Sequence, residues 1–224
     1  MFKYLRENIR AYKARDPAAR SSVEIFLLYP GIHAYIGHKL AHWLHSHKLL
    51  FLARYVSQTT RFFTGIEIHP GAKIGRRFVI DHGTGIVIGE TTEIGDDVLL
   101  YQGVTLGGTG KDEGKRHPTL GNNVLVGAGA KILGPIYIGD NSRIASGAVV
   151  LEEIPAEATA VGVPARVVRI AGRKTDYAAE LDQTGFVDPV EAELVALRCH
   201  LTALEKKVEE LTASRRNEEK NETI

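Results

Sequence analysis

Aliphatic side chains recur at every sixth position through the middle of the chain. This period differs from the two-residue period of an ordinary strand and from the 3.6-residue period of a helix. It predicts a triangular solenoid of short parallel strands, whose stacked coils bury a core that no single repeat forms alone. The period does not set the hand of the coil, and parallel crossovers are normally right-handed. The repeated residues are Ile68, Ile74, Ile80, Ile88, Ile94, Leu100, Leu106, Leu120, Val126, Ile132, Ile138, Ile144 and Val150.

The repeat is interrupted twice. Ile80 and Ile88 are eight residues apart, and Leu106 and Leu120 are fourteen residues apart. The second excess predicts a loop over residues 108–119 that leaves the solenoid, and its glycines, charges and proline suit such an excursion. Because loops on a rigid scaffold carry function, both interruptions are candidate sites.

Residues 1–64 are predicted to form an N-terminal helical domain. Asp16-Pro17 ends a first helix. Ser21 and Glu24 form a capping-box pattern ahead of the next one. Pro30-Gly31 is expected to break that segment, and helices over residues 32–47 and 49–62 follow. The first helix is indicated by four apolar residues at helical spacing, Phe2, Leu5, Ile9 and Tyr12.

The chain after the repeat divides into three parts. Residues 65–170 hold the solenoid and its closing segment, and 171–187 form a connector. A helix over 188–213 is predicted to form a short coiled coil, because apolar residues recur at alternating spacings of four and three. A tail, 214–224, follows. The seam consists of Val190, Leu194, Leu197, Leu201, Leu204, Val208 and Leu211.

Composition excludes several classes of protein. The formal net charge is +1, which gives no electrostatic footprint for nucleic-acid binding. The single cysteine, Cys199, excludes an internal disulfide framework and fits a reducing compartment. The sequence contains no apolar run long enough to span a membrane and no secretion signal, so a cytoplasmic location is expected.

Six segments resemble the serine O-acetyltransferases, a family of the hexapeptide-repeat acyltransferases. The resemblance implies a left-handed parallel β-helix that transfers the acetyl group of acetyl-CoA to the hydroxyl of L-serine. This reaction, which gives O-acetyl-L-serine and CoA, would be the first step of cysteine biosynthesis. The segments are RDPAAR (15–20), GIEIHPGAKIGRRFVIDHGTGIVIGET (65–91), QGVTLGGTGK (102–111), RHP (116–118), VGAGAKILG (126–134) and VGVPAR (161–166).

Two short motifs carry the candidate chemistry. Transfer to an alcohol requires a base near neutral pKa, and a histidine meets that need. His82 follows Asp81, which stands where the repeat usually has glycine. The resemblance makes His82 the general base and Glu67 its acidic partner, at a position where longer family members carry aspartate.

The resemblance also assigns the substrate contacts. Arg116 would bind the serine carboxylate, a natural use of a guanidinium group. His117 would lie against the substrate and help to hold the hydroxyl. Asp81 and Asp16 would receive the serine ammonium group. The alternative for Arg116 and His117 is a solvated loop, and for Asp16 a helix-capping role.

No nucleophile motif is present, which favours direct transfer over an acyl-enzyme. Backbone N–H groups at Gly107-Gly108 would stabilise the oxyanion. In the family the pantetheine arm lies along the coil edge between subunits, where small side chains are needed. Arg166 would meet the nucleotide phosphates. The small candidates are Gly108, Thr109, Ala128, Gly129, Ser146 and Gly147.

The resemblance further implies assembly and a partner. Relatives form homotrimers, and a three-stranded coiled coil would match that symmetry. Whether trimers pair into hexamers stays open. In this family a C-terminal isoleucine docks into O-acetylserine sulfhydrylase, which gives Ile224 a candidate role; an unremarkable terminus is the alternative.

Three other interpretations remain open. The acceptor could be homoserine or a sugar, and the solenoid could be a scaffold without catalysis. A carbonic anhydrase on the same fold would need three zinc ligands, for which the solenoid offers only His69, His82 and His117. A helical set, His38, His42 and His45, has metal-compatible spacing but is expected to be structural. No metal is therefore expected.

Overall fold

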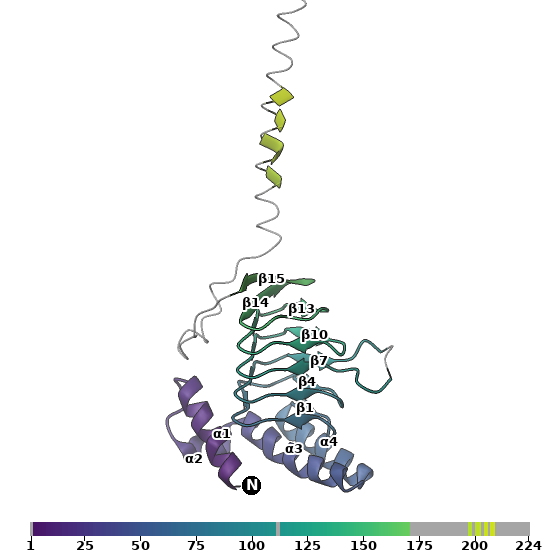
Figure 1. The fold of residues 1–224 in the computed structure, drawn as a ribbon. Coiled ribbons are helices and arrows are strands. Elements are labelled where there is room, and N and C mark those ends of the chain that lie inside the picture. Colours follow the sequence, from purple (N-terminus) through teal and green to yellow (C-terminus); the bar gives the residue numbers. More distant parts are fainter. Residues whose placement is uncertain are drawn as a thin grey trace, which may run out of the picture. The chain divides into compact units, whose positions relative to one another are not determined.

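The computed structural model describes residues 2–110 and 113–170, and nine residues of the C-terminal segment (197–198, 200–202, 204–205 and 207–208). The chain divides into two units, Met1–Phe186 and Val187–Ile224. The described residues of the first unit form four helices and a stack of short strands (Figure 1). In the second unit the described residues are helical. Four residues of the expected seam, Leu197, Leu201, Leu204 and Val208, are exposed there, and the coiled coil itself stays a prediction.

The helices are α1 (Phe2–Arg15), α2 (Ser22–Leu28), α3 (Pro30–Ser46) and α4 (Leu50–Thr64). Ser21 caps α2 as its pattern predicted, because its Oγ accepts the Glu24 N–H at 3.0 Å. The break predicted at Pro30-Gly31 is confirmed, because α2 ends at Leu28, and the next helix begins at Pro30 rather than at residue 32. At a first helical position proline loses no hydrogen bond, and its fixed φ suits the helix.

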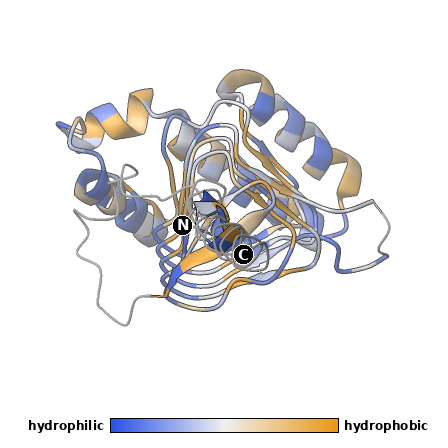
Figure 2. Ribbon diagram, turned by 90° about the horizontal axis from the view of Figure 1, so that it is seen from above, coloured by the Kyte–Doolittle hydropathy of each residue, from blue (hydrophilic) through white to orange (hydrophobic). Residues whose placement is uncertain are grey.

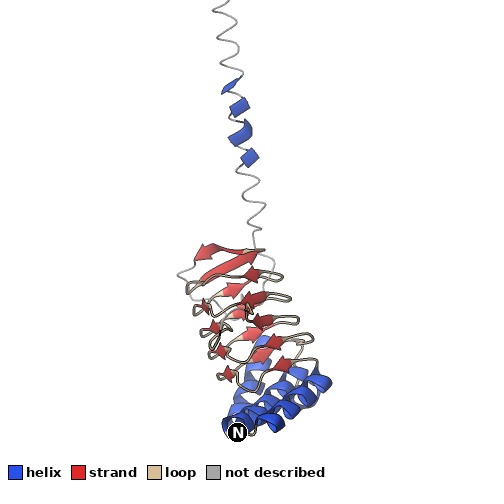
Figure 3. Ribbon diagram, turned by 90° about the vertical axis from the view of Figure 1, so that its right-hand side faces the viewer, coloured by secondary structure: helices blue, strands red, loops and turns tan. Residues whose placement is uncertain are grey.

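Three parallel sheets form the faces of the solenoid, and their strands stack in columns (Figure 3). Sheet A contains β1 (Glu67–Ile68), β4 (Val87–Ile88), β7 (Thr105–Gly107), β10 (Lys131–Leu133) and β13 (Val149–Val150). Sheet B contains β2 (Lys73–Ile74), β5 (Glu93–Ile94), β8 (Thr119–Leu120) and β11 (Tyr137–Ile138). Sheet C contains β3 (Val79–Ile80), β6 (Leu99–Leu100), β9 (Leu125–Val126), β12 (Arg143–Ile144), β14 (Ala158–Gly162) and β15 (Ala165–Ile170). The final pair, β14 and β15, is antiparallel and closes the stack.

The six-residue repeat is confirmed as the core of this solenoid. In sheet A the paired positions are Ile68, Ile88, Leu106, Ile132 and Val150, so the repeated residues form one column. All thirteen repeated residues are buried and belong to one hydrophobic cluster. Seen from above, successive coils superpose (Figure 2). Parallel register therefore places each aliphatic side chain on its counterpart in the next coil.

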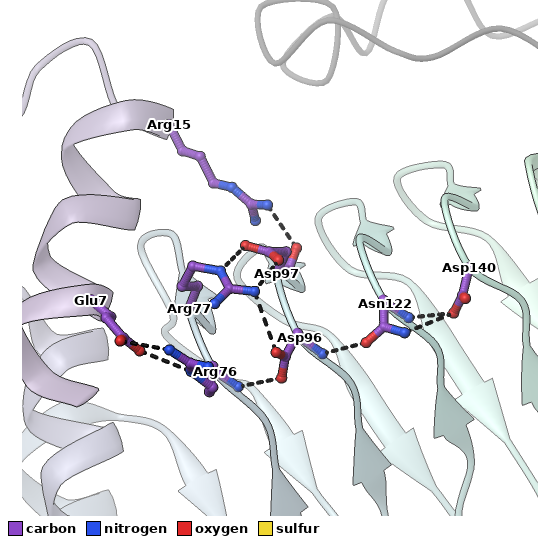
Figure 4. Close-up of polar contacts among 8 residues, drawn as sticks. All are labelled: Glu7, Arg15, Arg76, Arg77, Asp96, Asp97, Asn122 and Asp140. Atoms are coloured by element: carbon purple, nitrogen blue, oxygen red, sulfur yellow. Dashed lines mark hydrogen bonds and ion pairs between the residues drawn. The ribbon is translucent and has the colours of Figure 1, made fainter. Parts of the chain in front are cut away.

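Three corners join the sheets, and we name them by the sheets that they connect. The A–B corner contains the long loop, which leaves the stack after β7 at Gly107 and returns at Thr119, as predicted (Figure 1). The C–A corner begins at Asp81 in the first coil. The B–C corner is a ladder in which a side-chain oxygen accepts a backbone N–H of the preceding coil (Figure 4). Its bonds are Arg76 N to Asp96 Oδ1 (2.8 Å), Asp96 N to Asn122 Oδ1 (2.9 Å) and Asn122 N to Asp140 Oδ1 (2.6 Å).

The helices cover the open edge of the first coil. Its exposed-edge backbone carbonyls would otherwise lack partners, and buried backbone groups without partners are costly. Side chains of three helices supply the bonds. They are Asn8 to Phe78 O (3.2 Å), Tyr12 to Ile80 O (3.0 Å), Lys39 to Ile74 O (3.1 Å), His42 to Pro70 O (2.8 Å) and Ser57 to Ile68 O (2.7 Å).

A salt bridge and a hydrogen bond hold α1 against the B–C corner. Arg76 pairs with Glu7 of α1 at 2.6 Å, and Arg77 pairs with Asp97 at 2.6 Å (Figure 4). Arg15, the last residue of α1, donates to the Asp97 carbonyl at 2.7 Å. These contacts set the end of α1 and hence the position of Asp16, the residue that follows it.

Candidate active site

Asp81 and His82 lie on the C–A corner between β3 and β4. The two extra residues between Ile80 and Ile88 enlarge this corner, where His82 adopts φ +58° and its side chain is 76% exposed. Asp81 Oδ1 lies 3.8 Å from His82 Nε2. Burial raises the pKa of the Asp81 carboxyl, His82 opposes that shift, and Asp16 adds to it. The corner thus combines an accessible imidazole with a partly desolvated acid.

Asp16 reaches the neighbourhood of Asp81 from the end of α1. Its Oδ2 accepts a hydrogen bond from the Tyr29 hydroxyl at 2.5 Å, and its Oδ1 accepts the Ala18 N–H at 2.7 Å. The bond to Asp16 raises the pKa of Tyr29 to about 12, so this hydroxyl remains a donor. Two carboxylates from distant parts of the sequence are therefore brought together. A cationic group is the natural ligand of such a pair.

Glu67, the expected partner of His82, lies at the start of β1 on sheet A. Its Oε1 accepts hydrogen bonds from Arg54 and Gln58 of α4, each at 3.4 Å. Its Oε2 lies 3.3 Å from Arg61 Nε. Within the described residues Glu67 contacts α4 rather than His82, and the pairing of Glu67 with His82 stays a prediction.

Arg116 and His117 close the long loop on the A–B corner. The Arg116 guanidinium pairs with the Glu90 carboxylate and holds the pKa of Glu90 below its usual range. His117 Nδ1 lies 2.9 Å from Thr91 Oγ1. Burial, followed by the nearby Arg116 charge, lowers the pKa of His117. Neither Glu90 nor Thr91 was identified from the sequence, although both belong to the segment that carries the resemblance.

The predicted site residues thus fall into two groups on different corners of the coil. Asp16, Asp81 and His82 lie on the C–A corner, and Arg116 and His117 lie on the A–B corner. One side of the coil, containing β4, separates the corners. At about 3.3 Å per extended residue, the five steps from Thr84 to Gly89 span about 15–20 Å. One small amino acid cannot bridge both groups of a single chain.

The small residues expected to line the acetyl-CoA arm are also divided. Ala128, Gly129, Ser146 and Gly147 lie on the C–A corner, where the Gly147 N–H donates to the Ala128 carbonyl at 2.8 Å. A Cβ added at Gly129 or Gly147 would meet no atom within 4 Å. Glycines of successive coils form a column on this corner, and two of them, Gly85 and Gly103, were not singled out from the sequence. The column is Gly85, Gly103, Gly129 and Gly147, all with φ between +70° and +78°.

The remaining candidates lie elsewhere. Gly108 and Thr109 begin the loop on the A–B corner, and a Cβ on Gly108 would lie 3.0 Å from the Arg116 carbonyl. Arg166 is exposed in β15. Ile224 lies outside the described residues.

Two of the three helical histidines, His38 and His42, make structural contacts. His38 is buried, and desolvation lowers its pKa to about 3. His42 donates to the Pro70 carbonyl at 2.8 Å. Within the described residues there is no group of three or more histidine, cysteine, aspartate or glutamate side chains arranged to hold a metal ion. No helix in the same part of the chain is both long enough and apolar enough to cross a membrane.

Comparison with known proteins identifies the family. Residues 117–152 match the family model of the bacterial transferase hexapeptide (six repeats). The serine acetyltransferase of Bacillus pumilus is 50% identical over 216 residues, which cover 93% of this chain and 99% of that protein. The chain belongs to the serine acetyltransferase family. The family's enzyme from Helicobacter pylori strain J99 is 65% identical over 153 residues, which cover 68% of this chain and 90% of that protein.

Solved structures of family members share the fold. A serine acetyltransferase in complex with coenzyme A from Brucella abortus has a TM-score of 0.75 and 43% identity, covering 77% of this chain and 69% of that one. A Neisseria gonorrhoeae serine acetyltransferase in complex with serine has a TM-score of 0.73 and 39% identity, covering 75% and 69%. The solenoid is therefore the left-handed parallel β-helix that the resemblance implied.

Proposed function

We propose that this chain transfers the acetyl group of acetyl-CoA to the hydroxyl of L-serine, with His82 as the general base. The observation that carries this proposal is the C–A corner, where an accessible imidazole stands beside the Asp81 carboxylate and Asp16 is near enough to raise the pKa of Asp81. Family relatives are named serine acetyltransferases, and solved members contain coenzyme A or serine. The arrangement suits a substrate that carries both an ammonium group and a hydroxyl.

The reaction proceeds as a direct transfer. His82 accepts the hydroxyl proton while the serine oxygen attacks the thioester carbonyl carbon. The tetrahedral intermediate collapses with cleavage of the carbon–sulfur bond, and the departing thiolate takes the proton from His82. Asp81 and Asp16 hold the ammonium group, and Glu67 orients His82. The N–H groups of Gly107 and Gly108 stabilise the oxyanion.

A second copy of the chain completes the site. Arg116 binds the serine carboxylate and His117 supports the hydroxyl. Within one chain, however, the side of the coil that contains β4 separates both residues from His82. In a cyclic trimer the A–B corner of one copy meets the C–A corner of the next, which brings the two groups together. The same seam exposes the glycine column to the pantetheine arm of acetyl-CoA.

Two further assignments complete the proposal. Thr109, Ser146 and Arg166 contact acetyl-CoA along the seam, with Arg166 at the nucleotide phosphates. Ile224 binds the active site of O-acetylserine sulfhydrylase, because a free carboxylate beside an apolar side chain suits a preformed pocket.

Thiol release from acetyl-CoA tests the proposed function. We expect release with L-serine and little with homoserine, sugars or no acceptor. His82→Ala should lower kcat by about 100-fold or more, the contribution typical of a positioned base. His47→Ala, at the exposed end of α3, is the matched control and should retain wild-type turnover. Equal turnover of His82→Ala and wild type would refute the base, and no release with serine would refute the reaction.

A further inference from the structure

The turn Gly89-Glu90-Thr91 holds the end of the long loop between β7 and β8. It follows β4 on the A–B corner, one coil before the residues that close the loop. Glu90 pairs with Arg116, and Lys115 Nζ donates to the Thr91 carbonyl at 2.6 Å. This turn therefore forms the surface on which the Arg116-His117 pair rests.

Thr91 makes four contacts to the pair, and together they define the state of His117. Thr91 Oγ1 accepts the backbone N–H of Arg116 at 3.0 Å and that of His117 at 3.1 Å. The Thr91 backbone N–H donates to His117 Nδ1 at 3.2 Å, and the Thr91 hydroxyl lies 2.9 Å from the same nitrogen. A backbone N–H can only donate, so Nδ1 is an acceptor and the ring proton sits on Nε2.

Gly89 provides the space for the ring. A Cβ built on Gly89 would lie 1.9 Å from His117 Cδ2 and 2.1 Å from Nε2. No side chain can occupy this position while the imidazole stays where it is. This glycine is thus required by the approach of His117, which is independent of the hydrogen bonds made by Thr91.

The charges around the ring favour the same neutral form. Burial lowers the pKa of His117. The charges of Arg116 and Lys115 lower it further, and the charge of Glu90 opposes these effects. A neutral ring with its proton on Nε2 is a hydrogen-bond donor and cannot compete with His82 as a base through that nitrogen.

We propose that Thr91, supported by Gly89, is a positioning residue that fixes His117 in its neutral Nε2–H tautomer. His117 then donates to the hydroxyl oxygen of serine, which leaves the hydroxyl proton directed at His82. The second step rests on the proposed function, whereas the tautomer is a property of the free protein.

Histidine NMR of full-length protein tests the first step without any turnover. In wild type, the ¹⁵N shifts of His117, assigned with His117→Gln, should report a proton on Nε2. Thr91→Val removes the hydroxyl but keeps the backbone N–H. The Nδ1–H form should then become detectable, and the pKa of His117 should rise, because a hydrogen bond that favours the neutral form is lost. Thr91→Ser should restore the wild-type spectrum.

Kinetics with L-serine test the second step in the same variants. Thr91→Val should lower kcat/KM for serine by about 10-fold to 100-fold, and Thr91→Ser should recover most of it. Thr92→Val is the matched control, because the neighbouring Thr92 Oγ1 is buried and has no hydrogen-bond partner among the described residues. It should leave the NMR signals of His117 and the kinetics unchanged. Gly89→Ala should displace the ring and lower kcat/KM although Thr91 is intact.

Each outcome decides between the steps. An unchanged His117 tautomer in Thr91→Val overturns the positioning role. A changed tautomer with unchanged kcat/KM shows that the tautomer does not serve the reaction, and overturns the proposal. If wild type shows the Nε2–H tautomer, Thr91→Val alters it, and serine is not acetylated, the positioning role stands and the proposed function falls.

Discussion

His82 and its neighbours illustrate how single residues gain their roles from the corner that carries them. The side chain of His82 is 76% exposed on a left-handed corner, whereas the adjacent Asp81 is partly buried, with a raised carboxyl pKa. Asp16 reaches the same corner from α1 and is held there by Tyr29. The corner therefore separates an exposed imidazole from two acids suited to a cationic group.

Glu67 provides a test at the residue scale. We expect Glu67→Gln to lower kcat about 10-fold with little change in KM for serine, because it would remove the charge that we propose orients His82. Steady-state kinetics measure both constants. Glu93→Gln, which breaks a surface ion pair with Lys73, is the matched control and should retain wild-type kcat. An unchanged kcat in Glu67→Gln would assign this carboxylate to the contacts with α4 alone.

The sequence predicted part of the candidate site and missed part of it for a physical reason. Asp81 and His82 stand out because they interrupt the repeat, and Arg116 and His117 because they end a long loop. Thr91 has no such signal, since a threonine in a turn is common and its contacts to His117 exist only between coils. The division of the site over two corners also requires knowledge of which coil face each residue occupies.

At the scale of elements, the first coil depends on side chains from the helices. β3 is the edge strand of sheet C at the first coil. The hydroxyl of Tyr12 in α1 forms hydrogen bonds with both the N–H and the carbonyl of Ile80, each at 3.0 Å. Gly31 permits the approach, because a Cβ there would lie 2.2 Å from the Tyr12 hydroxyl. Ile80 directly precedes Asp81, so this contact also fixes the start of the C–A corner.

Tyr12→Phe should therefore destabilise the fold by about 1–3 kcal/mol, because it leaves two buried backbone groups of Ile80 without a partner. Urea unfolding measures this change. Tyr55→Phe on the exposed face of α4 should shift stability by less than about 0.5 kcal/mol. Equal midpoints for the two variants would show that the Tyr12 hydroxyl does not cap the edge.

The six-residue period predicted the elements of the solenoid because each repeat makes the same contacts. It could not predict the capping of the first coil, where unlike partners meet. Pro30 was predicted to break the segment and does so, but the next helix begins at Pro30 itself, two residues before the expected start. The local sequence pattern thus predicted the regular coils of the solenoid, but it did not predict how the helices cap the first coil.

At the scale of the whole molecule, His38 links stability to pH. Its pKa in the folded chain is about 3, below the ordinary value of 6.5, because burial disfavours the charged form. The unfolded chain therefore binds this proton first. The stability that the neutral ring contributes is fully present above about pH 6.5 and is lost as pH falls toward 3. From pH 7 to pH 5 the loss should be about 2 kcal/mol.

Urea unfolding at pH 7 and pH 5 tests this assignment. His38→Gln should show a smaller loss between the two pH values than wild type, because glutamine does not titrate. His47→Gln, at an exposed position, should show the wild-type loss. The same loss in His38→Gln and wild type would show that another group controls the pH response.

The central claim is that one active site uses His82 of one copy and Arg116 of the next. Co-expression of His82→Ala with Arg116→Ala tests it most directly, with native mass spectrometry to measure the mixed oligomers and thiol release at low serine to measure activity. Each variant alone should be nearly inactive. In a cyclic trimer mixed at random, about a quarter of the sites pair an intact His82 with an intact Arg116. We therefore predict recovery of about a quarter of wild-type kcat/KM; mixed oligomers with no recovery above the single variants would contradict the account.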